Sequence, residues 1–319
     1  MRLNGPSDTF AITYANDRMT DGACAQLQRI YGIYAVSRYL RVPYVHSPLK
    51  KIGYHGLHAL EDNASIHDIE ARYNALFTLE SDVDVPHDPV VHDMDSPTTE
   101  DVEGLRDLSR SDGRFHLCRI LLPYSIADQH PQIYRCVAEK SPFRKQKRPW
   151  LRVGIHVRRG ELFVLESHRM LPNSYYISCA KRVAELLTRA SVPFVCELYT
   201  EVPSKPFVVT PAHHWIAENR VPHEIVVSPD MNSVEEFDEI PHLQRRINVD
   251  QIETLEGLAT SDVLIMSRSS FSYVAAILNP RAAVICHPFW HSPLPGWILS
   301  GEDGSFSEAD FTRQLAARP

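Results

Sequence analysis

Short apolar segments alternate with longer segments of helical period along most of the chain. In the first half, this pattern predicts strands over residues 9–14, 42–45 and 115–122, and helices over residues 23–40 and 66–79. In the second half, it predicts strands over residues 151–157, 194–199, 224–227, 263–266 and 283–286, and helices over residues 173–189, 251–259 and 271–278. Such alternation is typical of parallel sheets with helices on both faces, so the sequence predicts an α/β fold. Two such units in tandem would place a ligand cleft between them.

One acidic, proline-containing stretch, residues 80–107, interrupts the alternation and is predicted to be a long surface excursion. It contains His87, Asp88, His92 and Asp93, whose side chains are of metal-ligating types. Because their spacing is irregular and their context is loop-like, we interpret them as solvated side chains and expect no metal site.

The length of 319 residues indicates two domains, because one hydrophobic core rarely serves a chain of this size. The basic, proline-flanked segment over residues 140–149 is predicted to be the linker between them. It could instead contact nucleic acid, but one short basic run in an acidic chain is usually solvated. We therefore expect an N-terminal domain over residues 1–145 and a C-terminal domain over residues 150–319.

The composition is typical of a globular protein, with 44% hydrophobic and 23% charged residues. The formal net charge of -7 argues against a general nucleic-acid binder, although a local basic pocket is compatible with it. No apolar run approaches membrane length, and the polar start of the chain does not resemble a signal peptide. We expect a cytoplasmic protein; the Golgi lumen is the alternative if a membrane anchor precedes this sequence.

The six cysteines are spread along the chain without a C-x-x-C pair, and most of them lie in apolar segments. This distribution favours reduced, buried thiols over a disulfide scaffold or a cysteine-based zinc site.

Two adjacent arginines and a glycine, Arg158, Arg159 and Gly160, directly follow the predicted strand over residues 151–157. A guanidinium group matches two phosphate oxygens at once, and a flanking glycine lets backbone N–H groups approach the same anion. Taken alone, such a tripeptide is more often a surface turn with solvated arginines. Its position at the end of a buried strand, together with a second motif, favours an anion-binding site.

The second motif is a hydroxyl-rich turn after the predicted strand over residues 263–266. Its serines, Ser267, Ser269, Ser270 and Ser272, can cap the next helix and, with the free N–H groups of that helix, bind an anion. Simple helix capping is the alternative. In parallel sheets, ligands bind beyond the carboxyl ends of the strands, where both this turn and the two arginines belong. Together the two motifs predict a diphosphate cradle.

Two further polar residues stand at predicted helix starts. Asp250 could cap the helix over residues 251–259, or it could accept N–H groups from a guanine edge or hold a ribose hydroxyl. Asn173 is a candidate cap of the helix over residues 173–189. The chain lacks G-x-G-x-x-G, the phosphate-loop lysine motif, G-x-S-x-G and H-E-x-x-H, so dehydrogenase, nucleotide hydrolase, esterase and zinc protease activities have no support.

Three segments together resemble the fucosyltransferase superfamily. Residues 156–161, His-Val-Arg-Arg-Gly-Glu, resemble the H-x-R-R-G-D signature shared by α1,2-, α1,6- and protein O-fucosyltransferases. Residues 267–276, Ser-Arg-Ser-Ser-Phe-Ser-Tyr-Val-Ala-Ala, resemble the later Ser-Ser-Phe-Ser motif, especially that of the α1,2 branch. Residues 21–28, Asp-Gly-Ala-Cys-Ala-Gln-Leu-Gln, are a weaker match to the glycine-rich first loop, which is usually closer to G-R-L-G-N-Q.

The resemblance implies a glycosyltransferase fold of the B type, in which two Rossmann-like domains face a central cleft. It also implies a metal-independent, inverting transfer of fucose from GDP-fucose to a hydroxyl of a glycan acceptor, with no other cofactor. Transfer of another sugar on the same scaffold, or nucleotide or glycan binding without transfer, are the alternatives. The sequence carries no signal for the acceptor or the oligomeric state.

The resemblance also implies roles for individual residues. Arg159, Arg158 and Glu161 are the implied catalytic residues: Arg159 would hold the β-phosphate, with Arg158 supporting it or paired internally, and Glu161 stands where the family usually has aspartate. The remaining donor-binding residues implied in the C-terminal domain are His156, Gly160, Asp250, Ser269, Ser270 and Phe271. From the first, acceptor-side domain, Gly22 and Gln26 would approach the donor.

Overall fold

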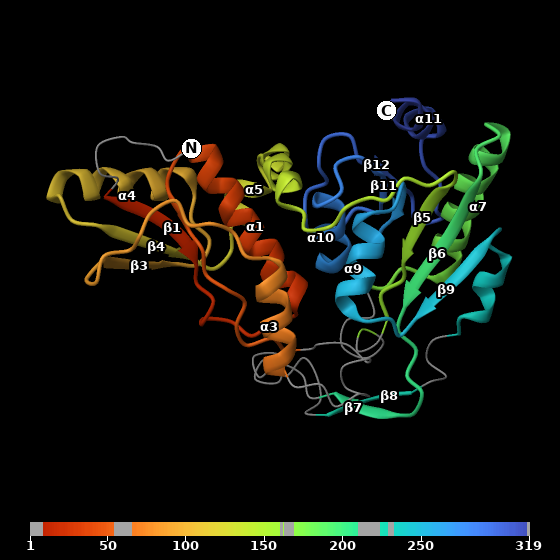
Figure 1. The fold of residues 1–319 in the computed structure, drawn as a ribbon, viewed down its shortest axis with the longest axis horizontal. Helices are drawn as coiled ribbons and strands as arrows, with labels where there is room; N and C mark the ends of the chain where they lie inside the picture. Colours follow the sequence, from red (N-terminus) through yellow and green to blue (C-terminus); the bar gives the residue numbers. More distant parts are fainter. Residues whose placement is uncertain are drawn as a thin grey trace. The chain divides into compact units, whose positions relative to one another are not determined.

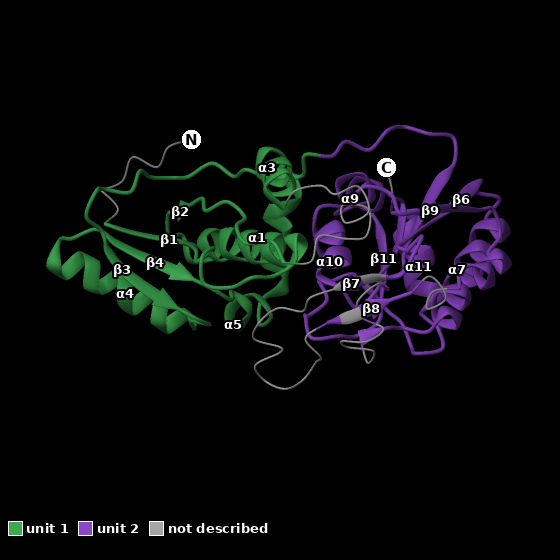
Figure 2. Ribbon diagram, turned by 90° about the horizontal axis from the view of Figure 1, so that it is seen from below, with its two compact units in different colours: residues 1–54, 66–142 green, residues 55–65, 143–319 purple. Residues whose placement is uncertain are grey.

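The computed structural model describes residues 9–53, 66–159, 162, 169–209, 224–228 and 233–317. These residues divide into two compact units, unit 1 up to Pro142 and unit 2 from Phe143 onward (Figure 1; Figure 2). Each unit has its own parallel sheet, which confirms the predicted α/β fold. Within the described ranges, no helix is both long enough and apolar enough to span a membrane.

Unit 1 is built on a four-stranded parallel sheet of order β2-β1-β4-β3. Its elements are β1 (Phe10–Tyr14), α1 (Ala23–Leu40), β2 (Tyr44–Val45), α3 (Ile66–Leu76), β3 (Val90–Met94), α4 (Thr99–Asp112), β4 (His116–Ile120), α5 (Tyr124–Ala127) and the 3₁₀ helix η1 (Pro131–Lys140). All five residues of β1 are buried, because α1 and α4 both pack on this central strand.

Helix α1 lies close to the segment that follows β4. A Cβ added at Gly32 would lie 2.6 Å from Cγ of Pro123 and 2.9 Å from the hydroxyl of Tyr134. The absence of a side chain at this position therefore allows α1 to pack directly against α5 and η1.

The prediction of a surface excursion over residues 80–107 is wrong, because this stretch contains β3 and most of α4. Strand β3 is an edge strand whose residues alternate between half-buried and exposed, so it lacks the apolar run of a central strand. Helix α4 begins with a capping box, in which the Asp101 N–H donates to Thr98 Oγ1 (3.3 Å) and the Thr98 N–H donates to Asp101 Oδ2 (2.8 Å). His92 belongs to β3, and its Nε2 lies 3.1 Å from Nδ1 of His116.

Unit 2 contains a six-stranded parallel sheet of order β12-β11-β10-β5-β6-β9. Its elements are β5 (Leu151–His156), α7 (Asn173–Arg189), β6 (Phe194–Thr200), β7 (Phe207–Val209), β8 (Ile225–Val227), the 3₁₀ helix η4 (Glu235–Glu239), β9 (Leu243–Ile247), α9 (Gln251–Ala259), β10 (Val263–Ile265), α10 (Ser270–Ile277), β11 (Ala283–Cys286), β12 (Ile298–Leu299) and α11 (Glu308–Ala316). Numbered along the chain without the β7–β8 pair, this order is 6-5-4-1-2-3, which is the doubly wound Rossmann topology.

Helices cover both faces of this sheet (Figure 1). On one face, Val153 and Ile155 of β5 pack with buried side chains of α7, including Tyr176 and Val183, in the main apolar core. On the other face, α9 approaches so closely that a Cβ added at Gly154 would lie 3.1 Å from the side chain of Ser261 and 3.3 Å from Leu258. The central strands β5, β10 and β11 are consequently buried on both sides.

Four strands of unit 2 differ from the sequence prediction, which did not include the short strands β7 and β12. The predicted strand over residues 224–227 exists as β8, but it pairs antiparallel with β7 in a separate two-stranded sheet. The edge position next to β6 is taken instead by β9, which the hydrophobic pattern did not reveal. Its residues alternate between half-buried and exposed, and two of the five are arginines, so its apolar signal is weak.

A buried ion pair connects β5, β6 and α9. Arg152 is 7% exposed and Glu197 is 4% exposed, and Arg152 Nε donates to Glu197 Oε2 over 2.7 Å. The same guanidinium donates to Thr260 Oγ1 (3.0 Å), the Tyr199 hydroxyl (3.1 Å) and the Gly257 carbonyl (3.2 Å). Burial raises the pKa of Glu197, but the charge of Arg152 and its hydrogen bonds outweigh this effect and hold the pKa below its usual value.

Removing only one partner of this pair should be strongly destabilising. In the Arg152→Met variant, Glu197 would stay buried with only the longer contact to Arg246 (3.4 Å), and we expect a loss of about 3 kcal/mol in the free energy of unfolding. Urea denaturation at pH 7 measures this loss. The double variant Arg152→Met/Glu197→Met removes both charges and should recover most of the stability. Equal stability of the single variant and the wild type would contradict the proposed role of the pair.

Candidate functional site

The two sequence motifs of unit 2 meet at one edge of the sheet. Strands β5 and β10 pair directly, with Val153 opposite Val263 and Ile155 opposite Ile265. Because the pairing is parallel, the residues after β5 and those after β10 emerge at the same edge. This is also the point at which the strand order reverses, where doubly wound sheets bind their ligands.

His156, the last residue of β5, connects the two motifs. Its Nδ1 lies 2.6 Å from Ser272 Oγ and 2.9 Å from Ser267 Oγ, and the side chain is buried. The ring of Phe271 lies 5.1 Å from the imidazole ring, measured between centroids. Burial, reinforced by the charges of Arg158 and Arg159, lowers the pKa of His156 to about 3. A neutral imidazole therefore holds the serine turn against β5.

The serines of the turn have different hydrogen-bond partners. Ser267 and Ser272 are occupied by His156 and by each other, because their hydroxyl oxygens lie 3.0 Å apart. Ser269 is the N-cap of α10, and its hydroxyl accepts the Phe271 N–H over 3.1 Å. Ser270 is the first helical residue and is half-buried. The amino end of α10 thus lies beside the carboxyl end of β5.

The two arginines after β5 differ in exposure. Arg159 is 4% exposed; its Nη2 donates to Asn173 Oδ1 (2.5 Å), and its guanidinium carbon lies 5.7 Å from the centroid of the Tyr176 ring. Arg158 is half-buried, and its Nη1 donates to Glu201 Oε2 over 3.3 Å. Arg158 is therefore the more accessible of the two cations.

Arg268 is a third cation at this edge, and it is not among the residues predicted from the sequence. It lies between Ser267 and Ser269, is half-buried, and its Nη2 lies 2.9 Å from Nδ1 of His287. Burial raises the pKa of Tyr176 to about 12, and the charges of Arg159 and Arg268 both oppose that increase. Both guanidinium groups therefore act on the same phenol. The signal for Arg268 was available, since a cation directly after a buried strand had already singled out Arg158.

Asn173 serves this site rather than its own helix. The N-cap of α7 is Pro172, so the predicted capping role of Asn173 is wrong. Its Oδ1 accepts from Arg159, while its Nδ2 donates to Glu236 Oε2 over 3.0 Å. The amide therefore orients the buried guanidinium from the start of α7.

Asp250 follows β9 at the same, carboxyl edge of the parallel sheet. Asp250 is the N-cap of α9, and its Oδ1 accepts the N–H groups of Ile252 (2.9 Å) and Glu253 (3.3 Å), as in the capping alternative. Gly160 and Glu161 lie outside the described residues.

Gly22 and Gln26 belong to unit 1. Gly22 is the N-cap of α1, and its N–H donates to Asp21 Oδ1 over 2.8 Å. Gln26 is fully buried; its Nε2 donates to the Lys50 carbonyl (2.7 Å), and its Oε1 accepts the Lys50 N–H (3.2 Å). The amide of Gln26 thus connects α1 to the chain after β2.

The described residues contain no group of three or more histidine, cysteine, aspartate or glutamate side chains arranged to hold a metal ion. No protein-family model and no curated protein sequence matches the chain.

Some solved structures share a distant similarity with the chain. POFUT1 in complex with GDP is 11% identical; the alignment covers 87% of this chain and 98% of that one, with a TM-score of 0.41. The E. coli heptosyltransferase WaaC with ADP is 10% identical; the alignment covers 96% of this chain and 98% of that one, with a TM-score of 0.39. At these values the similarity does not establish a family or an activity. The Rossmann topology of unit 2 follows from its own strand order.

The low pKa of His156 should appear in the pH dependence of stability. Between pH of about 6.5 and about 3, the unfolded chain protonates this residue and the folded protein does not. Stability should therefore fall as the pH decreases through this window and be independent of His156 above it. Urea denaturation from pH 7.5 to 5 should show a weaker pH dependence for His156→Asn than for the wild type. Identical slopes would show that His156 keeps an ordinary pKa.

Proposed function

We propose that unit 2 binds the diphosphate of a nucleotide-sugar donor at the edge formed by β5 and β10, and that the protein is a glycosyltransferase. The observation that carries the proposal is the gathering of Arg158, Arg159 and Arg268 around the amino end of α10. Guanidinium groups pair with phosphate oxygens in a bidentate geometry, and the first N–H groups of a helix add a fixed positive potential.

Cleavage of a sugar–phosphate bond explains why such a site would be cationic. Negative charge builds on the departing nucleoside diphosphate while the sugar acquires oxocarbenium character. Preorganised guanidinium groups and helix N–H groups stabilise that charge without reorganising during the reaction. They can supply the electrostatic stabilisation that other transferases obtain from a divalent cation, so the proposed transfer is metal-independent.

Exposure suggests how the three arginines share this work. Arg158 and Arg268 are half-buried, so incoming phosphate oxygens can replace part of their present contacts with Glu201 and His287. Arg159 is almost fully buried against Asn173, so it stabilises the phosphate charge electrostatically, without direct contact. This division modifies the role that the motif implies for Arg159 as the direct holder of the β-phosphate.

The sugar and the stereochemistry rest on the motif resemblance alone. It favours GDP-fucose as the donor, a glycan hydroxyl as the acceptor and inversion at the anomeric carbon. Within this proposal, Phe271 and Ser270 flank the diphosphate, and Asp250, the N-cap of α9, contacts the guanine or the ribose.

The decisive experiment supplies a panel of nucleotide sugars and follows thermal stability, then product formation. A ligand at about 100 times its dissociation constant adds about 2.7 kcal/mol to the free energy of unfolding, which is a measurable shift. Stabilisation by GDP and GDP-fucose, with release of GDP only when an acceptor glycan is present, supports the full proposal. Stabilisation by a different nucleotide, and not by GDP, would show that the donor carries that nucleotide instead of GDP. GDP binding without release from any donor would reject the transferase activity.

Single substitutions test the division of roles among the arginines. Arg158→Ala and Arg268→Ala should each weaken GDP binding and reduce the transfer rate by about 10²-fold, because each removes a donor to the developing charge. Arg159→Ala should instead lower stability as well as binding, since it leaves Asn173 and a buried site unfilled. Arg189→Ala, an exposed arginine on α7, is the matched control and should change neither. Unchanged GDP affinity in Arg158→Ala and Arg268→Ala would reject the cradle.

A further inference from the structure

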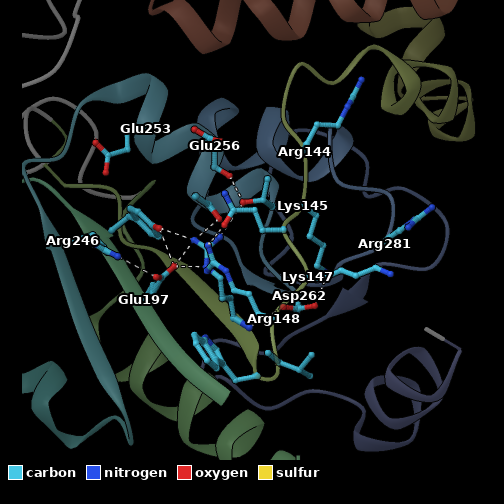
Figure 3. Close-up of a pocket in the computed structure, with 17 residues that line it drawn as sticks. Arg144, Lys145, Lys147, Arg148, Glu197, Arg246, Glu253, Glu256, Asp262 and Arg281 are labelled. Carbon is cyan, nitrogen blue, oxygen red and sulfur yellow. Dashed lines mark hydrogen bonds and ion pairs between the residues drawn. The ribbon is translucent and has the colours of Figure 1, made fainter. Parts of the chain in front are cut away.

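A cationic cavity of unit 2 lies beside α9 and the strands β5, β6 and β9. It has a volume of about 620 Å³, and all of its lining residues belong to unit 2 (Figure 3). One wall is the segment over residues 144–148, and the others come from β6, β9 and α9. Leu151 at the start of β5 and Asp262 directly before β10 line it at the amino ends of these strands, whereas Tyr199 and Arg246 line it near the carboxyl ends of β6 and β9. None of His156, Arg158, Arg159 and Arg268 lines this cavity, so its lining is distinct from the cluster after β5 and β10.

The floor of the cavity is a fixed polar layer. Arg152 is occupied by Glu197 and its other acceptors, so it supports the floor rather than offering a free cation. Asp262 Oδ2 accepts the Arg152 N–H over 2.8 Å, and Asp262 Oδ1 lies 2.5 Å from Lys145 Nζ. The ion pair with Lys145 attaches the wall segment to the sheet. The predicted linker is therefore, over these residues, part of a cavity wall.

The charges around the cavity do not balance. Seven lysine or arginine side chains and four carboxylates line it, which is an excess of three positive charges in a chain of formal net charge -7. Two of the carboxylates, Glu197 and Asp262, are neutralised by the ion pairs of the floor. Figure 3 shows Lys147 and Arg281 on one side of the cavity and Glu253, from α9, on the other. A concave cluster of like charges favours an anionic occupant.

The shape favours a small ligand over a nucleic acid. The volume falls within the range of small-molecule sites, about 300–1,000 Å³. A nucleic-acid surface would need a basic stripe extending beyond one cavity, and the chain as a whole is acidic. Trp150 also lines the cavity and is 45% exposed, so it offers a ring face and a spectroscopic reporter at the same place.

We propose that this cavity is a binding site for a small phosphorylated molecule, separate from the nucleotide edge. Lys147, Arg148 and Arg281 contact the phosphoryl oxygens, while the Arg152–Glu197 pair and the Lys145–Asp262 pair keep the floor and wall in place. The inference rests on the cavity and its charges, and it holds whether or not unit 2 binds a nucleotide sugar.

Pyrophosphate is the probe, with the fluorescence of Trp150 and isothermal titration calorimetry as readouts. We expect saturable binding that weakens as the salt concentration increases, because the contacts are exposed charges. The variant Lys147→Ala/Arg281→Ala should bind about tenfold more weakly or worse, since it loses two charge-assisted contacts. The control Lys181→Ala/Arg189→Ala removes one lysine and one arginine from exposed positions on α7 and should bind like the wild type.

Three further measurements assign the signal to this cavity. In Trp150→Phe, the fluorescence change should disappear while calorimetric binding persists. In Arg158→Ala/Arg268→Ala, and in wild type with excess GDP, pyrophosphate should still bind, so failure of the nucleotide site leaves this test intact. Absence of saturable binding, or equal affinity of the Lys147→Ala/Arg281→Ala variant, would overturn the proposal. If single-stranded DNA binds at this cavity more tightly than pyrophosphate does and displaces it, the small-molecule assignment would be overturned.

Discussion

Parallel pairing places β10 directly beside β5, although Arg152 and Asp262 at their amino ends are 110 residues apart in sequence. At the carboxyl edge, this pairing brings the arginines after β5 next to the serine turn after β10, with His156 holding the two together. At the amino edge, the same pairing closes the network of Arg152 and Asp262. Because both clusters depend on one strand contact, a slip in its register would disturb both at once.

The cations after β5 and β10 and the cations of the cavity differ in exposure and in their partners. At the carboxyl edge, Arg159 is buried against Asn173 and Tyr176, and the helix α10 adds the potential of its first N–H groups. In the cavity beside α9, Lys147, Arg148 and Arg281 are exposed and lie above a floor in which Glu197 and Asp262 both form ion pairs. The first arrangement fits the proposed stabilisation of charge that develops during a reaction, whereas the second fits the proposed reversible binding of an anion.

Periodicity predicted the elements of the apolar interior well, because buried strands such as β5 and amphipathic helices such as α7 leave a strong sequence pattern. It predicted the edge strand β2 but missed the edge strands β3, β9 and β12. Strands β3 and β9 bury only part of one face, so their sequences resemble loops or charged surface. Thr98 and Asp101 have the spacing of a capping box at the start of α4, but they lie in an acidic, proline-containing stretch whose composition is typical of a loop.

The sequence by itself determined where strands end in cations or hydroxyls, and this identified Arg158, Arg159 and the serine turn before any contact was known. Only the tertiary structure decided which of these groups remain accessible, because exposure depends on neighbours distant in sequence. In the structure, Gln26 is hydrogen-bonded to the backbone of Lys50, and Asn173 accepts a hydrogen bond from Arg159. Arg268 joins the cluster of arginines, and the basic segment after Pro142 forms one wall of the cavity. A local sequence pattern determines the chemical type of a residue and its place at the end of a strand or helix. The strand order and the packing of the tertiary structure determine which other residues it contacts.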